Sequence, residues 1–315
     1  MSIRIYLGTQ VEQTLASAVL AYSIRKRTAH TVDITPLYEA VSAANIEIPT
    51  PQDKTLRPRT PFTFQRFAIP ALCGYEGKAI YLDSDMLVFR DIAEIWEQPF
   101  EGLASQSGAV LADLLSVPEP PGSGRSPQYS VMLLNCAQLK WNAAQLVRDL
   151  ERGTWTYKEF VLNMSPAAIK RADLPLGWND LERYDPACTA LLHYTDMPYQ
   201  PWLSVQNPLA PLWCEELLRG IAEGAIALDT VQSSIDRGWV RPSLMAQIER
   251  GIADPQQLSD RVLKRDRDTF TPPHVWQKYL RHPVLRRSKP RRWFSRAYSI
   301  LKAIKSASAA RGSQV

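Results

Sequence analysis

The sequence predicts an α/β protein, because strand patterns and helix patterns alternate along most of the chain. Residues 3–7 alternate as a strand does, and a helical pattern follows directly, up to about residue 27. Residues 79–88 and 129–135 each contain a short apolar run rich in strand-forming residues. Helical patterns separate these runs, which is the order of elements found in α/β domains.

The composition is typical of a soluble globular chain with a sizeable core. The 315 residues are 45% hydrophobic and 22% charged, which is ordinary for such proteins. The first residues lack a basic and apolar leader, and no apolar run approaches the length of about 18 residues that suggests a membrane span. The four cysteines lie far apart without a C-x-x-C pair, which favours buried thiols over a disulfide framework or a zinc site. We therefore expect a cytoplasmic protein.

The other elements follow from local patterns. Thr9 and Glu12 match a capping box at the start of the first helix. Segment 116–128 consists almost entirely of turn formers, so it predicts either an acceptor-side lid or a surface loop. The remaining predicted elements are, in chain order, a strand over 30–36, a loop over 46–61, a helix over 62–72, a short helix over 91–96 capped by Asp91, a strand over 109–112, a helix over 137–151, a strand over 190–195 and helices between 202 and 250.

Charge is divided unevenly along the chain. Residues 269–315 contain 11 Lys or Arg and no Asp or Glu, whereas the first 268 residues hold 26 basic and 32 acidic side chains. Within this tail, residues 286–305 place apolar side chains at helical spacing after a basic cluster, which is typical of helices that bind anionic membrane surfaces. A helix docked on its own domain and a disordered tail are the alternatives. We expect a catalytic domain over 1–250 and a basic helical extension over 251–315.

Two carboxylates, Asp83 and Asp85, follow the apolar run that begins at residue 79. In an extended backbone, side chains two residues apart point to the same side, so both can bind one cation. Oxygen ligands suit Mg²⁺ or Mn²⁺, which usually complete their coordination with substrate phosphates. A D-x-D triplet also arises by chance in turns and caps, so the pair alone does not establish a metal site.

His193 lies near the end of the apolar strand over 190–195, as the two carboxylates do on theirs. Ligands of α/β proteins bind at the carboxyl ends of strands, so His193 is either a third metal ligand or a histidine of the core. The turn after the first strand carries one glycine, Gly8, and matches neither a dinucleotide fingerprint nor a P-loop.

Five segments in order between residues 3 and 202 resemble the glycosyltransferase family 8 group, which includes bacterial lipopolysaccharide galactosyltransferases and glycogenin-like proteins. They read FTFQRFAIPAL, AIYLDSDMLVFRDIAEIW, YSVMLLN, LPLGWN and HYTDMPYQPW. The second is very similar to the D-x-D strand and following helix of the family, and the last two resemble its L-P-x-x-W-N and H-x-x-G-x-x-K-P-W. The family has the GT-A fold and transfers sugars from nucleotides with retention, so the resemblance implies this fold and this activity.

The resemblance also implies roles for single residues. Asp83, Asp85 and His193 would bind a divalent cation, usually Mn²⁺, with Mg²⁺ as the alternative. Arg66 would face the donor phosphates or sugar, and a structural ion pair is its alternative. The other positions implied to bind the nucleotide sugar are Leu7, Gly8, Thr9, Gln10, Ser84 and Gln200.

The predicted catalytic residues are Gln128, Glu159 and Asn179. Gln128 and Ser130 replace the asparagine and glycine of the N-S-G-V strand of the family, near the donor sugar. Glu159 falls where the family has a glutamine near the reacting carbon, and a solvated helix residue is its alternative. Gln200 stands near the place of a lysine that contacts the diphosphate, so one cation is missing there.

The predicted function is metal-dependent transfer of a hexose from UDP-glucose or UDP-galactose to a glycan or lipid-linked acceptor such as lipopolysaccharide. The expected partners are the nucleotide-sugar donor, the acceptor and, through the tail, the anionic inner face of the cell membrane. Nucleic acid is not an expected partner, because no recognised binding module accompanies the basic charge. A catalytically inactive protein of the same fold that binds sugar nucleotides or glycans is the alternative. A nucleotidyltransferase is disfavoured because its glycine-rich basic loop is missing.

Overall fold

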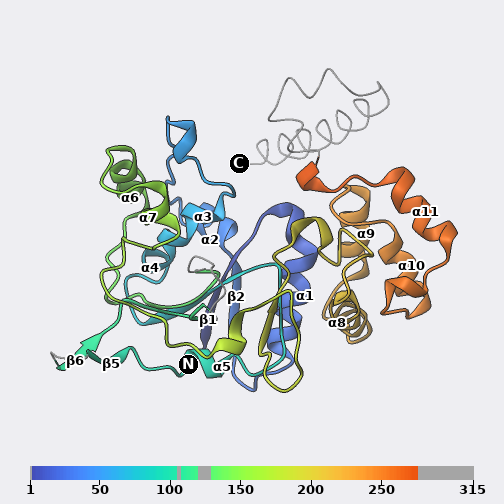
Figure 1. Ribbon diagram of the computed structural model, residues 1–315, viewed down its shortest axis with the longest axis horizontal. Helices are drawn as coiled ribbons and strands as arrows, with labels where there is room; N and C mark the ends of the chain where they lie inside the picture. Colours follow the sequence, from blue (N-terminus) through green and yellow to red (C-terminus); the bar gives the residue numbers. More distant parts are fainter. Residues whose placement is uncertain (1, 105–107, 120–128, 276–315) are drawn as a thin grey trace. The chain divides into compact units, whose positions relative to one another are not determined.

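A computed structural model describes residues 2–104, 108–119 and 129–275 of the chain (Figure 1). The chain divides into two compact units, the first ending at Thr195 and the second beginning at Asp196. The predicted boundary at residue 250 falls inside the second unit, and the division into 1–250 and 251–315 stays a prediction. Among the described residues, every helix is too short or too polar to cross a membrane.

A six-stranded mixed sheet forms the centre of the first unit (Figure 1), with the strand order β2-β1-β3-β8-β7-β9. β1 pairs in parallel with β2 and β3, whereas β8 runs antiparallel to β3 and β7. The predicted α/β class is therefore confirmed. The strands are β1 (Ile3–Gly8), β2 (Val32–Pro36), β3 (Lys78–Asp83), β7 (Leu114–Ser116), β8 (Val131–Asn135) and β9 (Lys170–Arg171).

Two small sheets accompany the central one. The first has the order β10-β11-β4, and the second is a hairpin of β5 and β6. In the first small sheet, β4 begins directly after Asp85, β10 begins directly after Asn179, and β11 ends at His193. The five strands are β4 (Met86–Val88), β5 (Glu101–Ala104), β6 (Gly108–Leu111), β10 (Asp180–Leu181) and β11 (Leu191–His193).

Helices cover the central sheet, and further helices build the second unit. The first unit contains α1 (Thr14–Arg25), α2 (Leu37–Ala43), α3 (Phe62–Gln65), α4 (Ile69–Leu72), α5 (Ala93–Trp96), α6 (Ala143–Glu151) and α7 (Tyr157–Val161). The second unit contains α8 (Ala210–Ala222), α9 (Leu228–Asp236), α10 (Ser243–Arg250) and α11 (Asp260–Thr269). The short 3₁₀ helices are η1 (Val11–Gln13), η2 (Lys54–Leu56), η3 (Arg66–Ala68), η4 (Leu176–Asn179), η5 (Met197–Tyr199) and η6 (Pro255–Gln257).

The core of the first unit has two halves, one on each face of the central sheet. On β3, Ala79 and Tyr81 join the cluster that includes residues of α4, α6 and α7, whereas Ile80 and Leu82 join the cluster that includes α1. This division follows from the alternation of side chains along a strand. In Figure 1, α1 and the group of α4, α6 and α7 lie on opposite sides of the sheet. The last residue of β3, Asp83, shares the face of Tyr81.

One local prediction is wrong, and another is refined. The capping box of Thr9 and Glu12 does not form, because η1 begins after Gln10 without a side-chain cap and the Thr9 hydroxyl lies 2.8 Å from the Ser17 hydroxyl. The helix predicted over 62–72 is confirmed as three successive helices, α3, η3 and α4, so that the α-helix is broken only by the 3₁₀ turn η3. Pro70, which has no N–H, lies in the first turn of α4, so it removes one α-helical hydrogen bond at this break.

A buried arginine organises part of the second unit. Arg241 is 1% exposed, and its Nε donates to the Pro201 carbonyl at 3.0 Å. Its backbone N–H donates to the Trp202 carbonyl at 2.9 Å, while its guanidinium also donates to Ser243 and Gln247. Because a buried charge is costly unless its donors are satisfied, this network holds the Pro201-Trp202 pair against the start of α10.

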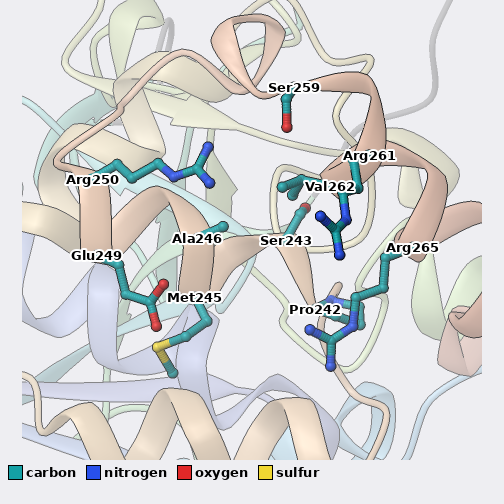
Figure 2. A pocket seen from close by; sticks show the side chains of 10 residues that line it. All are labelled: Pro242, Ser243, Met245, Ala246, Glu249, Arg250, Ser259, Arg261, Val262 and Arg265. Carbon is teal, nitrogen blue, oxygen red and sulfur yellow. The ribbon is translucent and has the colours of Figure 1, made fainter.

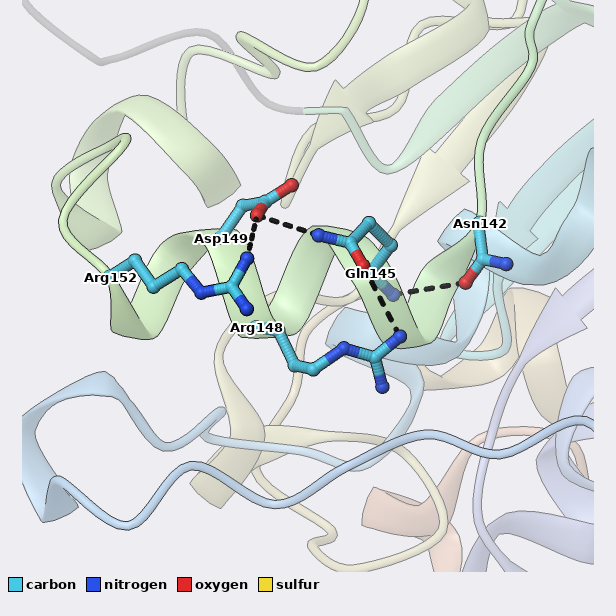
Figure 3. Close-up of polar contacts among 5 residues, drawn as sticks. All are labelled: Asn142, Gln145, Arg148, Asp149 and Arg152. Carbon is cyan, nitrogen blue, oxygen red and sulfur yellow. Dashed lines mark hydrogen bonds and ion pairs between the residues drawn. The ribbon is translucent and has the colours of Figure 1, made fainter.

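Helix α6 begins later than predicted, because Asn142 caps it. The Asn142 Oδ1 accepts a hydrogen bond of 2.9 Å from the backbone N–H of Gln145 (Figure 3). Farther along the helix, the Asp149 carboxylate accepts from the Gln145 side chain at 2.8 Å and from Arg152 at 3.3 Å. The cap satisfies a backbone donor that the helix itself cannot pair.

We expect Asn142→Ala to lower the free energy of unfolding by about 1 kcal/mol, because it removes the N-cap acceptor. Asn142→Asp keeps an acceptor and is expected to retain the stability. Urea unfolding at equilibrium measures both. Arg152→Ala is the control, since the pair with Asp149 is exposed and contributes less than about 1 kcal/mol. Equal losses in the Ala and Asp variants would contradict the capping role.

Candidate metal centre

Three predicted ligands, Asp83, Asp85 and His193, come together in the first unit. One ligand atom of each lies within 4.8 Å of those of the other two. Strand β11 pairs antiparallel with β4, so that His193 lies opposite Met86. The backbone N–H of Tyr194 donates to the Asp85 carbonyl at 2.8 Å. Strand register therefore places His193 beside Asp85, although 107 residues separate them in sequence.

Asp83 and Asp85 converge through a bend and not along a straight strand. β3 ends at Asp83 in the six-stranded sheet, and β4 begins at Met86 in the three-stranded sheet. The backbone N–H of Ser84 donates to the Gly8 carbonyl at 3.1 Å, which fixes the bend to the end of β1. The Ser84 hydroxyl is buried and has no hydrogen-bond partner among the described residues.

The His193 ring is held at both nitrogens. Its Nε2 lies 3.1 Å from Asp85 Oδ1, and its Nδ1 lies 3.0 Å from Asn179 Oδ1. Donation from Nδ1 to the Asn179 amide oxygen leaves Nε2 to serve as a ligand. Metal-binding histidines commonly have such a partner on the opposite nitrogen. Asn179, predicted as a catalytic residue, thus lies behind His193 and positions it.

The LPLGWN segment explains how Asn179 is held. Trp178, which precedes Asn179 in the sequence, is fully buried in the core. The backbone N–H of Ala190 donates to the Gly177 carbonyl at 2.8 Å, which ties η4 to the start of β11. A Cβ atom at Gly177 would overlap the Cys188 carbonyl oxygen. Glycine is needed here because only a residue without a side chain lets the two backbone segments approach so closely.

The charges of the site favour a cation. Burial and the neighbouring Asp85 raise the pKa of Asp83 above its usual value, against the effects of His193 and of hydrogen bonds from Tyr81 and Ser130. Burial lowers the pKa of His193, but the facing Asp85 and the nearby Asp83 together raise it more, so the net shift is upward. Two adjacent carboxylates repel unless a positive charge lies between them. The residues therefore form a group able to hold a divalent metal ion through oxygen and imidazole donors.

Sequence reasoning missed the role of Tyr81. Its hydroxyl donates to Asp83 Oδ1 at 2.6 Å, and its ring is buried. Burial, followed by the charge of Asp83, raises the pKa of Tyr81 well above its usual value, which keeps the hydroxyl protonated as a donor. The signal was present in the sequence, because Tyr81 lies two residues before Asp83 on one face of the same strand.

Gly8 lies beside this pair of side chains. It is opposite Asp83 in the register of β1 and β3. A Cβ atom at Gly8 would overlap the Tyr81 hydroxyl and would come within 2.8 Å of Tyr81 Cζ and 3.0 Å of Phe62 Cδ2. The one glycine of the first turn is therefore required by the packing of Tyr81.

The other positions implied to bind the donor have varied surroundings. The Leu7 side chain packs in the core, the Thr9 hydroxyl contacts Ser17, and Gln10 precedes η1 as a partly exposed residue. Gln200 is buried in the second unit, so its contact with the diphosphate stays a prediction. Gln128 lies outside the described residues.

Arg66 is 7% exposed and is bound to backbone carbonyls instead of a carboxylate. Its guanidinium donates to Val161 at 2.9 Å and to Tyr129 at 3.4 Å. Its Nε has no partner among the residues that the structure describes. A buried guanidinium with one unused donor is suited to an anionic ligand.

Glu159 has a clear structural role. Its carboxylate accepts from the backbone and the hydroxyl of Thr156, both at 2.8 Å, and so closes the capping box of α7. Hydrogen bonds from the Thr156 backbone and then from its hydroxyl hold the pKa of Glu159 below its usual value. The arrangement favours the helix-residue alternative over a part in catalysis.

Comparisons with known proteins show partial similarities. No family model matches the chain. Protein CDI of Arabidopsis thaliana is 34% identical over 92 residues, which are 29% of this chain and 35% of that protein. The chain thus spans about a third of the length of this curated relative.

Two solved glycosyltransferase structures align with most of the chain. The apo structure of the WbbM bifunctional glycosyltransferase has a TM-score of 0.49 and 14% identity, covering 69% of this chain and 49% of that one. The glycosyltransferase GlyE of Streptococcus pneumoniae TIGR4 has a TM-score of 0.48 and 18% identity, covering 69% and 60%. The chain spans less than two thirds of either protein. Both TM-scores are below 0.5.

We expect Gly8→Ala to lower the free energy of unfolding by about 1 to 3 kcal/mol, because the added methyl group overlaps the Tyr81 hydroxyl. Removal of that hydroxyl in Tyr81→Phe relieves the tightest contact. The cost of Gly8→Ala is therefore expected to be smaller in the Tyr81→Phe background, as a double-mutant cycle of urea unfolding measures. Equal costs in both backgrounds would contradict the packing argument.

We expect Asn179→Ala to weaken Mn²⁺ binding by about 10- to 100-fold, because His193 loses the acceptor that orients its ring. Titration of the protein with Mn²⁺, followed by electron paramagnetic resonance of the free ion, measures the affinity. Asn163→Ala, at an exposed position outside the ligand group, is the control. An unchanged affinity in Asn179→Ala would show that Asn179 does not support the metal ligand.

Proposed function

We propose that the protein is a metal-dependent, retaining glycosyltransferase with the GT-A fold. The observation that carries the proposal is the convergence of Asp83, Asp85 and His193, with Asn179 behind the histidine. The ordered sequence motifs support it independently, since they resemble family 8 in the same segments that build this group. The proposed reaction moves a hexose from UDP-glucose or UDP-galactose to a glycan or lipid-linked acceptor such as lipopolysaccharide.

The chemistry of a sugar nucleotide explains why such a group is needed. Departure of the nucleoside diphosphate leaves negative charge on its phosphate oxygens, and a bound divalent cation neutralises that charge. Asp83, Asp85 and His193 would hold the ion. We propose Mn²⁺, because it accepts carboxylate and imidazole ligands together, whereas Mg²⁺ favours oxygen ligands.

Neighbouring side chains preorganise the ligands. Tyr81 fixes the orientation of Asp83, and Asn179 fixes that of His193. Ligands that are locked before the substrate arrives lose little conformational entropy on binding. These two contacts support a centre built for one geometry instead of a chance cluster of acids.

The proposed donor contacts follow from what each residue leaves unused. The Arg66 Nε–H has no acceptor among the described residues and is proposed to contact the donor phosphates or sugar. The Leu7 and Thr9 side chains are engaged within the protein, so the uridine is proposed to contact the backbone of residues 7–10 and the side chain of Gln10. Ser84, whose buried hydroxyl has no partner within the described ranges, is a further proposed donor-side position.

A second candidate function is a protein that binds a sugar nucleotide or glycan without turnover. The carboxylate of Glu159 is used in the capping box of α7, so it is not available to stabilise a positively charged sugar ring. Gln200 also lacks the charge of the lysine in the family motif. These two positions favour weaker catalysis, and only an activity assay separates the two functions.

The membrane proposal depends on the tail. Residues 286–305, whose pattern predicts a basic amphipathic helix, lie outside the described residues. Binding of this tail to the anionic inner face of the cell membrane, and hence a peripheral cytoplasmic location, stays a prediction from the sequence.

We expect the protein to release UDP from UDP-glucose or UDP-galactose in the presence of Mn²⁺. Asp85→Asn and His193→Ala are each expected to lower the rate of UDP release by about 100-fold or more, because each removes a metal ligand. The loss should exceed that caused by substituting Asn179, which only supports a ligand. Asp33→Asn, at an exposed position on β2, is the control. Wild-type rates in either ligand variant would refute the assignment of the metal site.

The same preparation distinguishes the two candidate functions. Calorimetric titration with the UDP-sugars and Mn²⁺ measures binding without turnover. Saturable binding, without UDP release and without transfer to a broad panel of acceptors, would identify the binding protein and exclude the enzyme.

A further inference from the structure

A pocket of about 420 Å³ lies between α10 and α11 in the second unit (Figure 2). Its volume is in the range of sites for small molecules. Three arginines and one glutamate are among the residues that line it. The lining residues are Pro242, Ser243, Met245, Ala246, Glu249, Arg250, Ser259, Arg261, Val262 and Arg265.

The three arginines reach the pocket from two helices. Arg250 is the last residue of α10, whereas Arg261 and Arg265 lie one turn apart on α11. In Figure 2 the three guanidinium groups face the space between the helices, and the Glu249 carboxylate turns toward Met245. The positive charges therefore gather in the pocket, and its single carboxylate points away from them.

These arginines lack neutralising partners in the described part of the chain. Within residues 129–275, none of the three guanidiniums makes a hydrogen bond or an ion pair. Two nearby acids of α11 are engaged elsewhere: Asp266 accepts from the backbone N–H of Ser243 at 2.9 Å, and Asp268 pairs with Lys264. Like charges one helical turn apart repel each other, so an anion in the pocket would stabilise this arrangement.

The residues that line the pocket indicate which class of anion it would bind. Guanidinium groups match the oxygens of a phosphate with paired hydrogen bonds. The hydroxyl of Ser259, which caps no backbone N–H of α11, adds a neutral donor. Met245, Ala246 and Val262 provide apolar walls for a carbon skeleton attached to the phosphate.

We propose that this pocket binds a phosphorylated small molecule or headgroup through its phosphate, held by Arg250, Arg261 and Arg265. The site lies wholly in the second unit and shares no residue with the metal centre. It therefore does not depend on the proposed transferase function.

Calorimetric titration of the full chain tests the proposal, with glucose 6-phosphate and inorganic phosphate as probes at constant ionic strength. We expect saturable binding that the double substitution Arg261→Gln and Arg265→Gln weakens by about tenfold or more, because charged hydrogen bonds are lost. Arg267→Gln removes the same charge from α11 outside the pocket lining, and it should change the affinity less than about twofold.

A second arm identifies the source of the phosphate. Vesicles of phosphatidylcholine with and without phosphatidic acid are compared for binding to the wild type and to the double variant. A loss of phosphatidic-acid binding in the double variant, without binding of the soluble esters, would indicate a lipid headgroup. Binding of glucose 6-phosphate would indicate a soluble ester.

The proposal is overturned if neither soluble probes nor vesicles depend on Arg261 and Arg265, or if Arg267→Gln has an equal effect. Circular dichroism of each variant checks that the fold is retained, which is expected because these side chains are exposed. Asp85→Asn should leave phosphate binding in the pocket between α10 and α11 unchanged. The phosphate site can therefore be tested separately from the assignment of the metal site.

Discussion

The hydrogen bond from the Ser84 backbone to the Gly8 carbonyl is the contact on which the candidate metal centre depends. It holds the bend at which the chain leaves the central sheet after Asp83 and enters the small sheet at Met86. Because β4 then pairs with β11, the bend also sets where His193 lies relative to Asp85. One backbone contact thus joins three parts of the chain that sequence separates by up to 185 residues.

Close packing around this bend limits which residues can surround it. Tyr81 reaches Asp83 only because Gly8 has no side chain, and Asn179 reaches His193 where Gly177 lies against the backbone at Cys188. Both glycines act by allowing close approach, and neither has a positive φ angle. A larger residue at Gly8 would disturb the contact that positions Asp83, and a larger residue at Gly177 would disturb the segment that positions His193.

The two proposed sites follow from the same electrostatic principle with opposite signs. Asp83 and Asp85 place negative charge together beside His193, and this favours a cation. Arg250, Arg261 and Arg265 gather positive charge where Asp266 and Asp268 of α11 are engaged by other groups, and this favours an anion. Like charges held together by a fold cost stability unless a ligand neutralises them, so each cluster is better explained by binding than by packing.

The sequence by itself determined the α/β class, the apolar strands and the candidate ligands Asp83, Asp85 and His193, because hydrophobic periodicity and strand ends are local properties. It led to a wrong capping box at Thr9, because the competing contact with Ser17 depends on how the turn packs. Only the tertiary structure decided that Asn179 supports His193, and that arginines from two helices share one pocket. Such partners are set by long-range packing, and side-chain contacts between distant segments leave no periodic trace in the chain.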